Sequence, residues 1–204
     1  MKNGASVTKK QLDGAAVAVQ HELGRLGLWN EDGRLHTTDV VWCPIPQVFV
    51  PDASGFFLHS STRFGEFLGY QPGHIYIPKW VLDQGFWAQR RGSLRDLVRH
   101  EYGHAVAHHY PSLVIRSPRF TEAFGGTYFR GKPVKGNVRD FVSRYARTQP
   151  CEDFAETFML YVRHQGELPA PVNLPSHFGF DPIKRKWKFI ADMIGVIDSG
   201  GTQW

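Results

Sequence analysis

The sequence predicts a single α+β domain over residues 1–204, in which a small, twisted, mostly antiparallel sheet packs on a central helix and is followed by a helical half. Composition is the first reason: 42% hydrophobic and 14% aromatic residues suffice for one buried core in 204 residues. The second reason is helical spacing of apolar residues near the N-terminus and through the second half. The third is a series of short β-like runs in residues 38–82.

The sheet region, residues 38–82, consists of short apolar runs separated by Pro and Gly. We expect its strands at Val40–Trp42, Val48–Val50, Gly55–Leu58 and His74–Ile77. Pro72 and Pro78 flank the last run, which favours an edge strand that an extended peptide could join. A buried strand is the alternative interpretation of the same run.

Four helices are expected around this sheet, and each has a recognisable start or stop. Ser93 with Asp96 resembles a capping box, and Pro111 ends the helix that follows. Thr148 is a candidate cap for a later helix, because Pro150 suits a first turn. The expected helices cover residues 8–27, 93–109, 149–164 and 182–196.

The formal net charge of +5 comes from basic residues that are scattered along the chain. The densest group surrounds Trp187, and we interpret it as a solvated helix face. Nucleic-acid binding is therefore not expected. The members of this group are Lys184, Arg185, Lys186 and Lys188.

Cysteine usage and hydropathy indicate the cellular compartment in which the protein is expected. Cys43 and Cys151 are far apart and outside any C-x-x-C pattern, which favours reduced thiols. The first thirty residues lack a signal-peptide apolar region, and no run approaches the roughly 18 apolar residues of a membrane span. A cytoplasmic protein without a membrane partner is expected, with secretion by a specialised route as the alternative.

The motif that carries chemistry is His100-Glu101-Tyr102-Gly103-His104, within the helix expected at residues 93–109. Two histidines four residues apart project from one helix face, so both rings can bind one Zn²⁺ ion. The intervening Glu borders that face and can take a proton from a metal-bound water. The small Gly permits another element to approach closely. The H-E-x-x-H pattern therefore predicts a zinc-dependent hydrolase.

Two further histidines follow the motif. His108 lies four residues after His104, on the same helix face, but too far along the axis to share an ion with His100. We interpret His108 and His109 as rim or solvated residues. An exposed His-rich helix face without a metal is the structural alternative for the whole motif.

A catalytic zinc usually has three protein ligands, so one ligand must come from elsewhere in the chain. The longer metzincin pattern fails, because Ala107 and Tyr110 occupy its Gly and His positions. Two carboxylates remain, Glu152 and Glu122. We prefer Glu152, because Glu156 shares its helix face four residues later and can hydrogen-bond a ligating His.

Two separated segments together resemble a known group of proteins. The segments are His100-Glu101-x-x-His104 and Pro150 to Phe158, which reads P-C-E-D-F-A-E-T-F, with Tyr145 before it. They resemble the bacterial zinc-binding metallopeptidases and are similar to the catalytic domain of anthrax lethal factor and to the Pro-Pro endopeptidases. The likeness covers residues 93–162, strongly at the two motifs and weakly between them.

This resemblance implies a zincin-like fold, a gluzincin site and roles for particular residues. It implies Glu152 as the third zinc ligand beside the two histidines, and Glu156 as a hydrogen-bond partner of a ligating His. It also implies Tyr145 as stabiliser of the oxyanion and Glu101 as general base.

The expected function is that of a zinc metallopeptidase, a protease acting on a peptide or protein substrate, as an endopeptidase more than as an exopeptidase. One alternative is a non-catalytic binding module that zinc stabilises, which Glu101 argues against because a structural site needs no base. Another is a nucleic-acid-associated protease, which only the charge of +5 suggests.

Overall fold

The computed structural model describes residues 7–29, 33–43, 55–60, 69–79, 92–129, 136–169 and 181–204. Within these ranges five α-helices, two short 3₁₀ helices and three strands form an α+β fold. In chain order the elements are α1 (Lys9–Arg25), η1 (Arg34–Thr37), β1 (Val40–Cys43), β2 (Phe56–Phe57), β3 (Ile75–Pro78), α5 (Leu94–His109), α6 (Pro118–Phe124), η3 (Val138–Asp140), α7 (Pro150–Arg163) and α8 (Pro182–Asp198).

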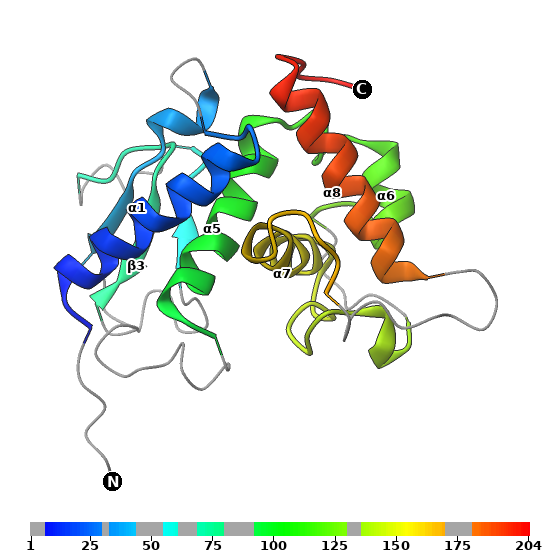
Figure 1. Ribbon diagram of the computed structural model, residues 1–204, viewed down its shortest axis with the longest axis horizontal. Coiled ribbons are helices and arrows are strands. Elements are labelled where there is room, and N and C mark those ends of the chain that lie inside the picture. Colours follow the sequence, from blue (N-terminus) through cyan, green and yellow to red (C-terminus); the bar gives the residue numbers. More distant parts are fainter. Residues whose placement is uncertain are drawn as a thin grey trace, which may run out of the picture.

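Helix α5 runs through the centre of the fold (Figure 1). The sheet and α1 lie on one side of it, and α7, followed by α6 and α8, lies on the other. One continuous apolar core joins these elements, with side chains from α1, β3, α5, α6, α7 and α8. The central helix is therefore covered on several sides, and eleven of its sixteen residues are buried.

The sheet is mixed, with the strand order β1-β3-β2. β1 pairs with β3 in parallel and β2 pairs with β3 antiparallel, so the expectation of a mostly antiparallel sheet is wrong for the described strands. Of the two interpretations of residues 73–77, the edge strand is wrong and the buried strand is confirmed, because β3 is central and buried. Pro72 and Pro78 lie in the turn before β3 and at its last residue, where neither interrupts the ladder. The run expected at Val48–Val50 and residues 80–82 fall outside the described residues.

Side chains alternate between the two faces of this sheet. Ile75 and Ile77 of β3 point into the main core, while Tyr76 between them belongs to a small separate cluster. Phe56 stacks on Tyr76 in that cluster, with ring centroids 5.5 Å apart. Its strand neighbour Phe57 packs against the main core instead. β2 therefore presents Phe57 to α5.

The caps of the helices follow their sequence signals in part. Ser93 and Asp96 form a reciprocal capping box at the start of α5, which confirms that prediction. The predicted cap at Thr148 is wrong, because its hydroxyl donates to the carbonyl oxygen of Tyr145 at 2.7 Å. Gln149 is the N-cap residue of α7 and provides no side-chain cap, and Pro150 occupies the first turn. The hydroxyl of Thr148 therefore stabilises the turn before α7 and does not cap the helix.

Helices α5 and α7 approach each other closely at Gly103. A Cβ atom at this position would lie 3.0 Å from the Cα atom of Ala155 and 3.4 Å from its Cβ. The predicted close approach of another element to Gly103 is therefore confirmed, and that element is α7. The crossing places the first turn of α7 beside the histidines of α5.

Buried charges reinforce the contacts between the helices. Arg99 of α5 donates to both carboxylate oxygens of Glu22 on α1, each at 2.7 Å, and Asp96 of α5 is paired with Arg163 of α7. Arg99 and Asp96 are buried, whereas Arg163 is exposed. Loss of Glu22 would leave the buried charge of Arg99 with one partner fewer, so this pairing helps to fix α1 against α5.

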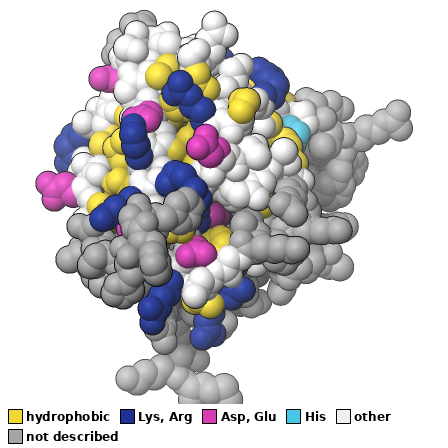
Figure 2. Space-filling model, turned by 90° about the vertical axis from the view of Figure 1, so that its right-hand side faces the viewer, with side chains coloured by type: hydrophobic (Ala, Val, Ile, Leu, Met, Phe, Trp, Pro, Cys, Tyr) yellow, Lys and Arg dark blue, Asp and Glu magenta, His cyan; other side chains and the backbone are white. Residues whose placement is uncertain are grey.

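Lys186 corrects the interpretation of the basic group around Trp187 as a solvated face. Its side chain is buried on α8, where the ammonium lies 2.7 Å from Oδ2 of Asp153 on α7 and donates to the carbonyl oxygen of Asp140 at 2.6 Å. Lys184 and Lys188 are exposed, as expected. On the face that Figure 2 shows, basic side chains are dispersed among acidic, apolar and other groups.

No helix among the described residues has the length and apolar character needed to cross a membrane. Cys43 and Cys151 are both buried, and they are not bonded to each other.

We expect Gly103→Val to destabilise the protein by about 1–3 kcal/mol, because the added side chain overpacks the crossing of α5 and α7. The matched control is Gly14→Val in α1, where a Cβ atom meets nothing within 4 Å and the free energy of unfolding should change by less than about 0.5 kcal/mol. Urea denaturation of both variants measures this difference. Equal stability of the two variants would contradict a tight crossing.

Candidate metal centre

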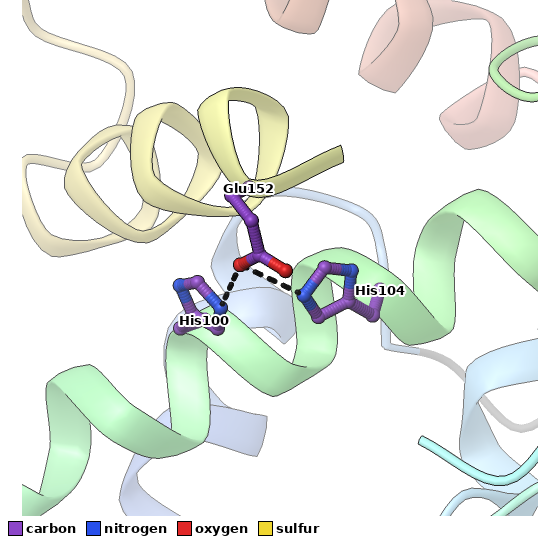
Figure 3. Close-up of side chains that lie close together, drawn as sticks. All are labelled: His100, His104 and Glu152. Atoms are coloured by element: carbon purple, nitrogen blue, oxygen red, sulfur yellow. Dashed lines mark ion pairs between the residues drawn. The ribbon is translucent and has the colours of Figure 1, made fainter. Parts of the chain in front are cut away.

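Three side chains of the sequence motifs converge where α7 crosses α5. His100 and His104 project from α5, and Glu152 projects toward them from the first turn of α7 (Figure 3). Oε2 of Glu152 lies 3.2 Å from Nε2 of His100 and 3.7 Å from Nε2 of His104. One ligand atom from each residue falls within 4.8 Å of the other two. These three side chains could hold a metal ion.

The spacing of these donors fits zinc. Ligand distances of about 2.0–2.1 Å in a tetrahedral site place neighbouring ligand atoms roughly 3.3 Å apart. The two observed nitrogen–oxygen distances, 3.2 and 3.7 Å, lie on either side of that value. Within the described residues the buried Oε2 of Glu152 makes no hydrogen bond of normal geometry. Two imidazole nitrogens and a carboxylate oxygen are a ligand set that zinc prefers.

Each histidine ring is also held from its other nitrogen. Nδ1 of His100 lies 2.9 Å from Oε1 of Glu156, and Nδ1 of His104 lies 2.8 Å from the hydroxyl oxygen of Tyr128. An imidazole that binds a metal through Nε2 carries its proton on Nδ1, and both oxygens can accept that proton. The partners thus orient both Nε2 atoms toward Glu152.

Tyr128 is a residue that sequence reasoning missed. It is buried, and burial raises its pKa well above the usual value, so the hydroxyl stays uncharged and accepts through a lone pair. It lies 24 residues beyond His104, after the break at Gly125. Only its place at the end of the aromatic segment that starts at Phe120 could have drawn attention to it.

The carboxylates and histidines of this group shift each other's pKa. Burial lowers the pKa of His100, but contacts with Glu152 and Glu156 outweigh burial and raise it to about 10. Burial raises the pKa of Glu152, yet contacts with His100 and His104 hold it well below its usual range. In the metal-free state both carboxylates are therefore ionised and the His100 ring is protonated at neutral pH.

Glu101 is buried beside these residues, with 3% of its surface exposed, and lies against the backbone of Gly55. A Cβ atom at Gly55 would lie 2.8 Å from Oε1 of Glu101 and 2.7 Å from Cδ1 of Ile77. Only a glycine leaves the carboxylate this position. The start of β2 therefore lines the site on the side of Glu101.

Tyr145 and Glu122 differ in their distance from the site. The ring of Tyr145 lies beside His100, with centroids 5.9 Å apart and planes tilted by 39°. Glu122 is exposed on α6 and is not part of the group that His100, His104 and Glu152 form.

The two histidines after the motif have partners of their own. Nε2 of His109 lies 2.8 Å from Oγ1 of the buried Thr38, and His109 itself is half-buried, which agrees with a rim position. His108 stacks on His59 with centroids 4.6 Å apart and parallel planes. Burial, and then the neighbouring histidines, lower the pKa of His108 to about 4, so this ring is uncharged at neutral pH.

Comparison with known proteins finds similar chains without an assigned activity. Uncharacterized protein Rv2568c of Mycobacterium tuberculosis and Uncharacterized protein Mb2598c of Mycobacterium bovis are each 31% identical to this chain over 132 residues. The match covers 55% of this chain and spans 38% of the length of those relatives. No protein-family model and no solved structure matches the chain.

We expect Tyr128→Phe to weaken zinc binding about 10- to 100-fold, because Nδ1 of His104 loses its hydrogen-bond acceptor while the ring of residue 128 stays in place. Tyr110→Phe is the control, since it removes the hydroxyl of another buried tyrosine. Competition with a chromophoric chelator measures both affinities. Wild-type affinity in Tyr128→Phe would show that this hydroxyl does not support the ligand.

Zinc binding should release a proton near neutral pH, because His100 is protonated in the metal-free state, with a pKa of about 10, and must lose that proton to bind. Raising the pH removes the competing proton, so the apparent affinity should increase by about tenfold per pH unit below pH 10. Calorimetric titration in buffers of different ionisation enthalpy counts the released protons. A binding heat independent of the buffer would contradict the expectation.

Proposed function

We propose that the protein is a zinc-dependent metallopeptidase with a zincin-like site, acting on peptide bonds within a chain. The observation that carries this proposal is the convergence of His100, His104 and Glu152 at the ligand spacing of tetrahedral zinc, with Glu101 buried beside them. The pattern of a metal-binding helix crossed by a second helix with the third ligand supports a gluzincin arrangement.

Each residue near the metal group has a distinct role in this proposal. Zinc bound by the three ligands would lower the pKa of a water molecule toward neutrality and polarise the substrate carbonyl. Glu101 takes the proton of the attacking water and delivers it to the leaving amine. The ring of Tyr145 lies beside His100, and we assign its hydroxyl the role of stabilising the oxyanion. Glu156 and Tyr128 keep the two imidazoles oriented.

Glu152 is preferred over Glu122 as third ligand for a geometric reason. Glu152 lies within the group of donors, whereas Glu122 is exposed on α6. Glu156, one helical turn after Glu152, holds His100 at the same time. A single helix, α7, thereby provides both the ligand and the support for its neighbour.

The outer edge of β2 supports an extended peptide as the substrate. The amide of Leu58 donates to His74, and its carbonyl accepts from Gly73, so the main-chain groups of Leu58 point to β3. Those of Phe57 and His59, one residue to either side, point away from it. No described strand pairs with this edge, and the preceding Gly55 touches Glu101. A peptide added there lies beside the base.

The alternatives have weaker support. A non-catalytic module stabilised by zinc accounts for the ligands that join α5 and α7, but it gives no role to Glu101. A nucleic-acid-associated protease needs a concentrated basic surface. Basic side chains are dispersed on the face of Figure 2, and Lys186 is occupied by Asp153 in the interior.

The test separates the base from the ligand. Glu101→Gln should retain one zinc per chain and lose about 10²- to 10⁴-fold in peptide hydrolysis, because it removes proton transfer alone. Glu152→Ala should lose zinc and activity together, while Glu122→Ala should keep both. Zinc content by atomic absorption and cleavage of a proteome-derived peptide mixture, followed by mass spectrometry, give these values.

Wild-type cleavage by Glu101→Gln would refute the peptidase proposal. Full zinc content in Glu152→Ala would instead remove Glu152 from the ligand set.

A further inference from the structure

Four aromatic rings form a continuous surface one helical turn beyond His104. We name this surface the aromatic platform; its members are Phe57, His59, His108 and Phe129. His108 is the centre, with Phe57 at 5.5 Å, His59 at 4.6 Å and Phe129 at 5.9 Å between ring centroids. Phe129 is 62% exposed and His59 is also exposed, so part of this surface faces solvent.

The platform is physically connected to the metal group. Tyr128 holds His104 through its hydroxyl, and its ring contacts both His108 and Phe129, with centroids 6.0 and 5.0 Å away. Phe57 of β2 and His59, two residues later, present their rings to the same side, and both contact His108 of α5. The platform is therefore built around His108, on the same face of α5 as His104.

The spacing along α5 suits an extended peptide. His108 lies four residues after His104 on the helix, which is about 6 Å along the axis. Side chains on one face of an extended chain repeat every two residues, at about 6.6 Å. A peptide whose scissile carbonyl lies at the metal therefore brings a side chain within two residues of that bond over His108.

We propose that the aromatic platform is a recognition subsite for one large aromatic or aliphatic side chain of the substrate, within two residues of the cleaved bond. This inference rests on the proposed function and adds the class of substrate. Its chemistry matches that occupant: the rings offer apolar faces, and aromatic pairs prefer the tilted and offset arrangements that four rings already adopt. A charged side chain at that position would lose hydration that the apolar faces of Phe57 and Phe129 do not replace in full.

The experiment compares two sets of substrates and two exposed positions. Wild type should cleave peptides with Phe, Tyr, Trp, Leu or Met at one position near the bond about 10- to 100-fold faster in kcat/KM than the Ala versions. The variants Phe129→Ala and His59→Ala should lower the ratio of the two kcat/KM values toward one. Val17→Ala is the control, because Val17 is 51% exposed on α1 and lies outside the site.

A wild type without that preference, or variants that lose cleavage of both peptide sets equally, would overturn the subsite. Failure of the zinc-loaded wild type to cleave any peptide would refute the proposed function separately. In that case binding decides the subsite: N-acetyl-phenylalanine hydroxamate should bind the zinc-loaded protein at least about tenfold more tightly than the alanine hydroxamate. Equal affinities would overturn it.

Discussion

The close crossing of α5 and α7 at Gly103 is the constraint on which the rest of the structure depends. A Cβ atom at residue 103 would lie only 3.0 Å from the Cα atom of Ala155, so the two helix backbones approach closely. Glu152 is one turn before Ala155, and Glu156 follows it directly. With the backbones further apart, neither carboxylate would reach its histidine. The crossing distance therefore controls both the metal ligands and the support of His100.

The buried charges are arranged to make this crossing specific. Two carboxylates of α7 face His100, and a third, Asp153, points to Lys186 of α8 on another side of the same helix. Burial raises the pKa of Asp153 to about 6 although Lys186 lies close, so this carboxylate loses substantial solvation in the fold. Rotating α7 about its axis would leave several of these charges without a partner. Charge pairing thus adds a rotational constraint to the distance that Gly103 imposes.

The local features of the fold could be predicted from the sequence, and features set by packing could not. The capping box of Ser93 and Asp96 and the helices that carry the two motifs depend on neighbours in the chain, and the structure has them. The shared face of His100 with His104, and of Glu152 with Glu156, also follows from helix periodicity alone. Tyr128 could not be found this way, because its contact with His104 spans 24 residues and a chain reversal. The central place of β3 and the burial of Lys186 depend on partners from distant segments for the same reason.

The sheet contributes to the site through the side of β2 that faces α5. Gly55, directly before β2, touches Glu101, and Phe57 of β2 touches His108, so two positions on the side facing α5 meet the proposed base and the aromatic platform. The intervening Phe56 stacks on Tyr76 and anchors the strand to β3 from the opposite face. Because β3 is central and paired on both sides, β2 cannot shift along it without moving Gly55 away from Glu101. The strand register therefore places Gly55 against Glu101, while the helix crossing places Glu152 against the histidines of α5.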